Sequence, residues 1–396
     1  MATYIARGAG GLETYLAEEL VSFGIDPGPT ERGAVLFEAP EFPSSGGIAL
    51  LRGLSFWARG IDRVGLLLVR AEVDGLRQIA EQARAGDYRR LLDAGRSFAV
   101  RAQRRGEHDF GSLDVARAVG AAVIDSVVAA GGPRPPVSLG DPDVILRAEV
   151  LGRSFRLWLD ATGDAPLYRR DYRRQLHPAS ARASMAHLLL RVAGWDGEPL
   201  LDPMAGIGTI PIEAGLYALG IAPGTRRGTP YAIDRLLADG RAAPLEAGDT
   251  DGFAPPPPLL GPHDELDVRG IERYEHHVQG AWLNLAAAGP LPGVRIEHGD
   301  ACRLERNVDA GRYRLAVLNP PFGRRIGSTG MVRDLYRRFA RSASCTGIER
   351  VVTLAENRTV MSGALEDGGF DVVDAIAVQY GDLPAWVISA ARRTGS

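Results

Sequence analysis

Two short motifs have residue types and spacing suited to binding a nucleotide-like ligand. The first reads LLDPMAGIGTI over residues 200–210: an apolar run ends in Asp202 and turns through Gly206 and Gly208 into a helical pattern. Glycines let the backbone approach a ligand without a Cβ in the way, and free N–H groups at a helix start attract a carboxylate or phosphate. The motif alone fits a nucleotide-type site and a tight turn that binds nothing equally well.

The second motif is Asn-Pro-Pro-Phe at 319–322, directly after the apolar run 315–318. Consecutive prolines fix the backbone and leave carbonyl groups without competing donors nearby. Together with the side-chain oxygen of Asn319, such a carbonyl can accept hydrogen bonds from an exocyclic amine, and Phe322 can stack on a flat base. This motif predicts a pocket for a base that carries an amino group, with a plain turn as the competing interpretation.

The elements around both motifs predict a doubly wound α/β sheet in the C-terminal half. Apolar runs predict strands at 199–202, 268–271, 294–298, 315–318, 350–354 and 372–379, and helical periodicity predicts helices at 180–193, 210–219, 274–288, 332–342 and 359–368. In such sheets, ligands bind in the crevice at the carboxyl ends of the strands. Both motifs follow a strand, so we expect them to converge there.

The N-terminal half predicts two small α+β units rather than one large sheet. Its pattern places strands at 35–38, 64–71, 97–103, 143–149 and 153–160, and helices from residue 12 to about 20, at 76–92 and at 114–130. The stretch 163–178 has four Arg, two Tyr and no apolar period, which predicts an extended linker. Residues 226–264, rich in Gly, Pro, Ala and acids, predict an insertion with a short helix near 233–237.

Composition excludes several classes of protein. At 396 residues, with 45% hydrophobic and 24% charged residues, the chain has the composition of a globular protein of two or three domains. Two cysteines, Cys302 and Cys345, and seven scattered His give neither a disulfide framework nor a metal site, and predict a reducing, cytoplasmic setting. The apolar runs are too short to span a membrane, and no secretory signal is visible at the N-terminus.

Charge is balanced over the chain but locally clustered. The net charge is −3, and all 46 cationic residues are Arg, which excludes chemistry that needs a Schiff-base or phosphate-loop lysine. Arginines gather at 101–105, 169–174 and 324–325, so basic patches rather than a wholly basic surface are expected.

The motifs together resemble a known family. DPMAGIGTIPIEA at 202–214 and NPPFGRR at 319–325 resemble motifs I and IV of Rossmann-fold, S-adenosylmethionine-dependent amino-methyltransferases. The segments 98–101, 105–108, 143–146 and the exit 159–172 resemble a THUMP RNA-binding domain and its linker, and GLETYLAEEL at 11–20 is similar to the ferredoxin-like domain that accompanies THUMP. The chain thus resembles the THUMP-containing RNA guanosine-N2 methyltransferases, most closely the branch that acts on an acceptor-stem guanosine of tRNA.

This resemblance implies a domain plan. It places a ferredoxin-like domain at 1–70, a THUMP domain at 71–163, a linker at 164–180 and a Rossmann-fold methyltransferase domain at 181–396, with the insertion at 226–264. The implied fold class is therefore α/β, with two α+β domains ahead of the methyltransferase sheet.

The resemblance also implies roles for individual residues. Glu272 would bind the ribose hydroxyls of the cofactor, and Asp300 with Ala301 would contact its adenine; the competing interpretations are a solvated helix-start acid and a loop cap. The remaining cofactor contacts would be Asp202, Ala205, Gly206, Gly208, Thr209 and Asn319, and the target guanine would be held by Asn319, Pro320 and Phe322. Ala205 and Ile207 depart from the Cys and Ser common in the family, and Ile207 either crowds the cofactor or packs behind it.

RNA, most closely tRNA, is the implied partner, and neither DNA nor a membrane is expected. The phosphate contacts would be Arg101, Arg104, Arg105, Arg169, Arg170, Arg173, Arg174, Arg324 and Arg325, although a solvated surface charge is the competing interpretation for each. Three other functions fit the motifs: a 23S ribosomal RNA guanosine-N2 methyltransferase, an N6-adenine methyltransferase, and a catalytically inactive RNA-binding THUMP protein. The sequence predicts no oligomeric state.

Overall fold

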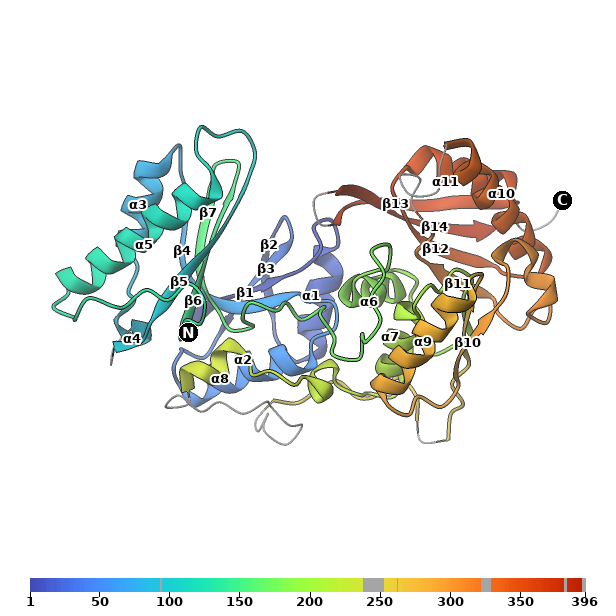
Figure 1. Cartoon of the computed structure of the whole chain (residues 1–396), viewed down its shortest axis with the longest axis horizontal. Helices are drawn as coiled ribbons and strands as arrows, with labels where there is room; N and C mark the ends of the chain where they lie inside the picture. The colour runs from blue at the N-terminus through green and yellow to red at the C-terminus, as the bar shows by residue number, and fades with distance from the viewer. Residues whose placement is uncertain (93–94, 238–252, 262, 322–328, 381–382, 394–396) are drawn as a thin grey trace.

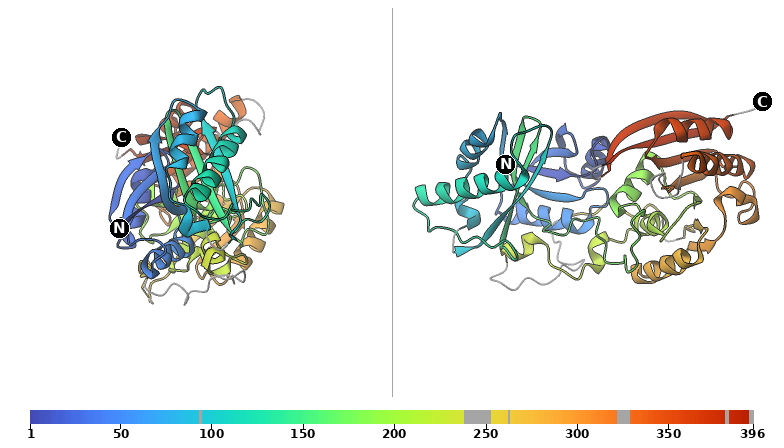
Figure 2. Two further views of the ribbon diagram at one scale, coloured as in Figure 1. Left: turned by 90° about the vertical axis from the view of Figure 1, so that its left-hand side faces the viewer. Right: turned by 45° about the horizontal axis from the view of Figure 1, so that its top comes forward.

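The structure is a computed structural model that describes residues 1–92, 95–237, 253–261, 263–321, 329–380 and 383–393. Within these residues the chain forms two sheets of seven strands each, one from the N-terminal half and one from the C-terminal half. The molecule is elongated, and the two sheets lie toward opposite ends of its long axis (Figures 1 and 2).

The N-terminal sheet has the strand order β2-β3-β1-β4-β7-β6-β5. Its strands are β1 (Ala2–Arg7), β2 (Pro27–Glu31), β3 (Ala34–Ala39), β4 (Arg63–Glu72), β5 (Phe98–Arg105), β6 (Val144–Leu151) and β7 (Ser154–Asp160). Its helices are α1 (Glu13–Ser22), α2 (Ser45–Trp57), α3 (Leu76–Arg84), α4 (Arg89–Leu92) and α5 (Ser112–Ala129). Helices α3 and α5 lie together at the end of the molecule farthest from the C-terminal sheet (Figure 1).

The prediction of two units without a common sheet is wrong, because β4 joins them. Over Arg63–Leu66 this strand pairs antiparallel with β1, and over Gly65–Glu72 it pairs antiparallel with β7. A strand of ten residues has two long edges, and each edge takes a partner from a different unit. Alternation of apolar and polar residues predicts that a strand forms, but it does not predict which strands it pairs with. The sequence analysis therefore could not find this pairing.

The C-terminal sheet has the strand order β10-β9-β8-β11-β12-β14-β13. Its strands are β8 (Leu200–Asp202), β9 (Val268–Glu272), β10 (Val294–His298), β11 (Leu315–Leu318), β12 (Arg350–Ala355), β13 (Phe370–Tyr380) and β14 (Leu383–Arg392). Its helices are α6 (Ala183–Val192), α7 (Thr209–Ala218), α9 (Glu275–Ala288), α10 (Thr329–Cys345) and α11 (Arg358–Asp367), with 3-10 turns η2 (Pro223–Arg226) and η4 (Ala301–Arg306).

The predicted alternation of strands and helices in this half is confirmed. Strands β8 to β12 pair in parallel, and β10 and β11 have the predicted bounds. The sequence analysis missed β14, which lies antiparallel between β12 and β13. The prediction relied on strands alternating with helices. Strand β14 follows β13 directly as an antiparallel hairpin, without a helix between them, and so departs from this alternation.

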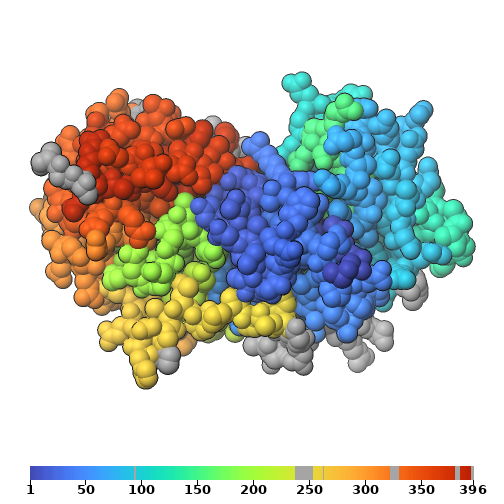
Figure 3. All heavy atoms as spheres, turned by 180° about the vertical axis from the view of Figure 1, so that it is seen from behind, coloured from blue at the N-terminus to red at the C-terminus, as the bar shows by residue number. Residues whose placement is uncertain are grey.

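The predicted insertion runs back along the N-terminal half. It contains the predicted short helix, α8 (Ala232–Leu237), whose Asp234 pairs with Arg52 of α2 at 3.0 Å. At its other described end, the ring of Phe253 lies 5.1 Å from that of Phe23, in the α1 region. Figure 3 shows the stretch that follows residue 253, in yellow, lying against the lower side of the N-terminal segment, in blue. The insertion therefore connects the two halves through side-chain contacts.

A buried ion pair also joins the halves. Arg170 of the linker donates to Glu213 of α7 at 3.3 Å and to the backbone oxygen of Arg59 at 2.8 Å, and the hydroxyl of Tyr172 donates to Glu213 at 2.9 Å. Arg170 is 6% exposed and Glu213 is fully buried. One guanidinium therefore contacts the N-terminal half, the linker and the C-terminal domain.

We expect the substitution Glu213→Ala to lower the free energy of unfolding by about 3–5 kcal/mol, because it leaves the buried guanidinium of Arg170 without its counter-charge. Urea titration of the purified protein measures this change. The matched control is Asp125→Ala, which removes the exposed partner of Arg84 and is expected to cost less than about 1 kcal/mol. Equal stability of the two variants would contradict the structural role of the pair.

Candidate active site

A pocket of about 120 Å³ lies at the carboxyl ends of the central parallel strands. Strand order reverses between β8 and β11, and such a reversal is where open α/β sheets bind ligands. The strand ends contribute Asp202, Met204, Ala205, Gly206, Thr209, Ile210, Glu272, Tyr274, His277, Asn319 and Pro321, and the linker and its continuation contribute His177, Ala179, Ser180 and Ala181. Both sequence motifs converge in this pocket, as predicted.

The glycine turn after β8 has an open side and a packed side. Gly206 and Gly208 both adopt left-handed φ angles, +55° and +83°. A Cβ on Gly206 would meet no atom within 4 Å, whereas a Cβ on Gly208 would lie 2.5 Å from Cδ1 of Ile296. Gly206 thus lines the pocket, and Gly208 is required for close packing against β10.

The carboxylate of Glu272, at the end of β9, is buried and hydrogen-bonded within the protein rather than solvated. The residue is 7% exposed, and its carboxylate accepts hydrogen bonds from the backbone N–H groups of Gly206 and Tyr274, both at 2.9 Å. Nδ1 of His277 lies 3.3 Å from the same carboxylate. The glycine turn and the acid predicted to bind ribose are therefore in direct contact.

Asp202 is buried at the end of β8, where its carboxylate accepts a hydrogen bond from the backbone N–H of Met204 at 3.1 Å. Burial, with a smaller contribution from the nearby charge of Glu272, raises the pKa of Asp202 to about 8. A carboxyl group with so high a pKa in a cleft is typical of functional sites.

Asn319 follows β11 and presents an unsatisfied acceptor. Its Nδ2 donates to the backbone oxygen of Ala179 at 2.9 Å. Its Oδ1 is buried, and no donor in the described part of the chain reaches it. Since buried polar atoms are nearly always hydrogen-bonded and Asn319 lines the pocket, this oxygen is a candidate acceptor for a donor group of a ligand.

Other predicted residues lie around the pocket rather than in it. Asp300 accepts a hydrogen bond from the N–H of Cys302 at 2.9 Å and so caps η4, while Ala301 is buried beneath it; neither lines the pocket. Pro320 is buried, and its neighbour Pro321 lines the pocket instead. Phe322, Arg324 and Arg325 lie outside the described residues.

Ile207 packs behind the glycine turn and does not crowd the pocket; the sequence left both arrangements open. It is 4% exposed and does not line the pocket, and its backbone oxygen accepts a hydrogen bond from Asn284 of α9. The bulky residue at this position therefore leaves the pocket open. The sequence analysis missed Tyr274 and His277, which follow Glu272 closely, and missed the linker side of the pocket entirely, for which the chain carries no local signal.

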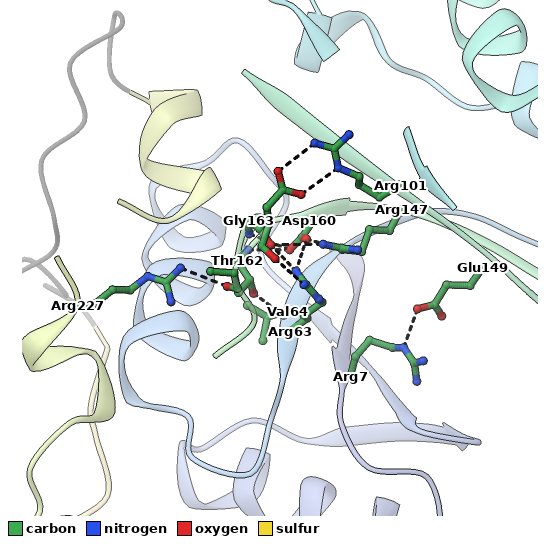
Figure 4. Close-up of polar contacts among 12 residues, drawn as sticks. Arg7, Arg63, Val64, Arg101, Arg147, Glu149, Asp160, Thr162, Gly163 and Arg227 are labelled. Carbon is green, nitrogen blue, oxygen red and sulfur yellow. Dashed lines mark hydrogen bonds and ion pairs between the residues drawn. The ribbon is translucent and has the colours of Figure 1, made fainter. Parts of the chain in front are cut away.

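A larger cleft of about 1140 Å³ lies in the N-terminal half. It is lined by seven arginines, Arg7, Arg32, Arg63, Arg70, Arg105, Arg147 and Arg182, and by four acids, Glu31, Asp62, Glu72 and Glu149. Figure 4 shows how the acids order the arginines: Arg63 and Arg147 both point at Asp160, and Arg7 points at Glu149. The lining carries more positive than negative side chains, so the cleft suits a polyanion.

The predicted phosphate contacts divide into different environments. Arg105 lines this cleft, Arg104 donates to the backbone of Gly106, and Arg101 makes a two-pronged ion pair with Asp164 (Figure 4). Among the linker arginines, Arg169 and Arg174 are exposed and Arg173 is half-buried. The prediction for Arg170 is wrong in this structure, because its guanidinium is buried in the ion pair with Glu213 and cannot face a phosphate.

Comparisons with known proteins agree with this architecture. Residues 170–385 match the model of the RMKL-like methyltransferase domain, and residues 74–160 match the THUMP domain. The chain is 34% identical over 94% of its length to an Archaeoglobus fulgidus protein named tRNA (guanine(6)-N2)-methyltransferase, covering 88% of that protein. The chain belongs to the THUMP-containing RMKL-like methyltransferases.

Further relatives of this methyltransferase include proteins named as tRNA methyltransferases and proteins named as ribosomal RNA methyltransferases. It is 32% identical to a second tRNA (guanine(6)-N2)-methyltransferase, from Methanocaldococcus jannaschii, over 94% of this chain and 95% of that protein. It is 31% identical to ribosomal RNA large subunit methyltransferase K/L of Pseudomonas aeruginosa, over 85% of this chain but 46% of that protein.

Solved structures share the whole fold of the methyltransferase. TrmN from Thermus thermophilus superposes with a TM-score of 0.68 at 25% identity, covering 99% of this chain and 100% of that one. A chain complexed with SAH superposes with a TM-score of 0.78 at 20% identity, covering 100% and 99%. Within the described residues, no helix is long and apolar enough to cross a membrane, and no group of three His, Cys, Asp or Glu side chains is placed to hold a metal ion.

The raised pKa of Asp202 predicts a pH-dependent stability. In the folded protein Asp202 keeps its proton up to about pH 8, whereas in the unfolded chain the same carboxyl loses its proton near pH 4. Because the folded state therefore binds more protons than the unfolded state between these values, Asp202 lowers the free energy of unfolding as pH rises from about 4 to about 8. We expect Asp202→Asn to gain melting temperature relative to the wild type between pH 5 and pH 8, by a few degrees, with no further gain above pH 8. A constant difference across this range, measured by differential scanning fluorimetry, would contradict the assignment.

Proposed function

We propose that this protein transfers the methyl group of S-adenosylmethionine to the exocyclic N2 of a guanosine in tRNA. The observation that carries the proposal is the buried, unpartnered Oδ1 of Asn319 in a pocket that also contains Asp202, the glycine turn and Glu272. This acceptor suits an amino group, and the relatives that match over most of their length are named as tRNA guanine-N2 methyltransferases.

The residues of the pocket fit S-adenosylmethionine. Gly206 leaves open space where any side chain would project, and Glu272 offers carboxylate oxygens suited to a pair of ribose hydroxyls. The buried carboxyl of Asp202 suits the positively charged part of the ligand, because a nearby cation would stabilise its ionised form. Asp300 and Ala301 remain proposed adenine contacts beside this site. Bound in the pocket, the cofactor supplies an electrophilic methyl group on a sulfonium.

The protein's own contribution to the reaction is alignment. The lone pair of a guanine N2 amine is delocalised into the ring, so the amine is a poor nucleophile at rest. By accepting an N–H hydrogen bond, Oδ1 of Asn319, with the neighbouring Pro320 backbone, would favour the tetrahedral amine whose lone pair can point at the methyl carbon. A strong general base is not required, since the proton can leave after transfer, and Phe322 is proposed to stack on the extruded base.

RNA binding is proposed for the arginine-lined cleft and for the exposed arginines of the linker. Most of the arginines that line the cleft come from the N-terminal sheet and its turns, on both sides of β4, and Arg182 at the start of α6 adds one from the methyltransferase domain. Phosphate contacts of this kind fix the orientation of RNA and carry little sequence information. A cytoplasmic setting, expected from the cysteine content, stays a prediction.

Ribosomal RNA is the second candidate substrate, because the chain also matches methyltransferases named for the large ribosomal subunit RNA. The match covers less than half of those proteins. An inactive RNA-binding role is less well supported than either, because Ile207, which in the other arrangement would crowd the cofactor, packs behind the turn and leaves the pocket open.

Incubating the protein with methyl-labelled S-adenosylmethionine and unmodified tRNA is expected to give N2-methylguanosine, identified by mass spectrometry of nucleosides. Asn319→Ala should lower the rate by about 100- to 1000-fold, the usual cost of removing one group that stabilises a transition state. The matched control is Asn307→Ala, whose amide lies outside the pocket. Label confined to ribosomal RNA would move the enzyme to the other branch, and N6-methyladenosine as product would overturn the guanine assignment.

Neutralising the linker arginines tests the RNA contacts. The triple substitution Arg169→Gln, Arg173→Gln and Arg174→Gln should weaken tRNA binding and make the slope of log affinity against log salt less negative by about 2, at roughly 0.7–0.9 for each phosphate that is no longer neutralised. Affinity for S-adenosylmethionine should not change. The matched control replaces three exposed arginines outside the linker, Arg341 on α10 and Arg392 and Arg393 at the end of β14. An unchanged slope in the linker variant would defeat the assignment.

A further inference from the structure

Three of the contacts that tie the linker to the methyltransferase domain lie next to motifs of the pocket. Arg170 and Tyr172 bind Glu213 in the helix that follows the glycine turn. The amide of Asn284 binds both backbone groups of Gln175, and its Nδ2 also donates to Ile207 in the glycine turn. The third point is Ala179, which contacts Asn319 itself.

The contact with Ala179 decides which atom of the Asn319 amide faces away from the linker. A carboxamide has an acceptor oxygen and a donor nitrogen of nearly the same size, so rotation by half a turn exchanges them. A backbone oxygen only accepts, and the carbonyl of Ala179 therefore selects the orientation with Nδ2 toward the linker, at 2.9 Å. Oδ1 is then left buried and unpartnered for an incoming amine. In the opposite orientation, the amide would present a donor to a donor.

Ala179 is in turn held by His177. The backbone N–H of Ala179 donates to Nδ1 of His177 at 3.2 Å, a side-chain to backbone bond two residues along the chain. The His177 ring packs edge-on against His277, with centroids 4.7 Å apart, and His277 contacts Glu272. A continuous set of contacts therefore runs from the acid predicted to bind the cofactor, through the linker, to the asparagine predicted to bind the target amine.

We propose that His177 is a positioning residue: through the Ala179 carbonyl it fixes the orientation of the Asn319 amide and so makes methyl transfer depend on the docked linker. This inference rests on the proposed function, in which Oδ1 of Asn319 accepts from the target amine. The effect of His177 on Asn319 passes through one backbone carbonyl, so His177 acts on the amine only indirectly.

Two substitutions separate this role from simple packing. His177→Phe keeps an aromatic ring against His277 but removes the acceptor for the Ala179 N–H. His177→Asn removes the ring but keeps a side-chain oxygen that can accept from the N–H two residues on, as asparagine does in Asx turns. His276→Phe is the matched control, since His276 also packs against His277, at 4.2 Å, but lies on α9 and makes no hydrogen bond to the described part of the linker.

The test is single-turnover methylation of unmodified tRNA with enzyme and S-adenosylmethionine in excess, together with separate binding measurements for each. We expect His177→Phe to lower the single-turnover rate about 10- to 100-fold, in the range expected for misalignment at a reacting centre, while both affinities change less than about twofold. His177→Asn should recover most of the rate, and His276→Phe should match the wild type. A wild-type rate for His177→Phe, an equally slow His177→Asn, or a fall in affinity as large as the fall in rate would each overturn the inference.

A double-mutant cycle with Asn319→Ala distinguishes failure of this inference from failure of the proposed function. If His177 acts only through Asn319, His177→Phe should slow Asn319→Ala by less than about twofold. Additive effects would show a separate role for His177 and reject the inference. A fully active Asn319→Ala enzyme would instead reject the proposed acceptor, and with it the function on which the inference depends.

Discussion

The structure depends on one buried charge. Arg170 lies where the N-terminal half, the linker and the methyltransferase domain meet, and it is neutralised there by Glu213 and bound by the backbone oxygens of Leu167 and Arg59. An unpaired guanidinium in a protein interior costs several kcal/mol, so the two halves cannot separate at this point without exposing it to water or losing that energy. The pair thereby helps to hold the N-terminal half and the candidate active site in one relative orientation.

The same constraint shapes the active site. Once Arg170 and Tyr172 are anchored on α7, the linker continues over α9, where Asn284 holds Gln175, and reaches Ala179 at the pocket. The pocket therefore has two sides of different origin. The parallel register of β8, β9 and β11 sets one of them, and a segment without helix or strand sets the other. The linker that leads from the N-terminal half is therefore held at the pocket through a few hydrogen bonds.

Arginines that are equivalent in the sequence have separate roles in the fold. Arg169 and Arg170 are neighbours in a basic cluster, yet one is exposed and the other is buried. In the N-terminal cleft, Asp160 holds Arg63 and Arg147, and Tyr168 lies under the guanidinium of Arg182, 4.6 Å from its ring centroid. Acids and aromatic rings thus restrict the side chains and leave an excess of positive charge, which explains how a chain with a net charge of −3 can offer a basic surface.

The sequence by itself determined the features that depend on neighbouring residues. Apolar period and motif spacing gave the methyltransferase sheet from β8 to β12, the glycine turn and Asn319, whereas the family and the role of Glu272 came from the resemblance. Only the tertiary structure decided the shared strand β4, the antiparallel β14, the burial of Arg170 and the linker side of the pocket. Each of these needs a partner far away in the chain: Arg170 and Glu213 are 43 residues apart, and Ala179 and Asn319 are 140 apart. Local patterns carry no information about such partners, because packing of the whole chain brings them together.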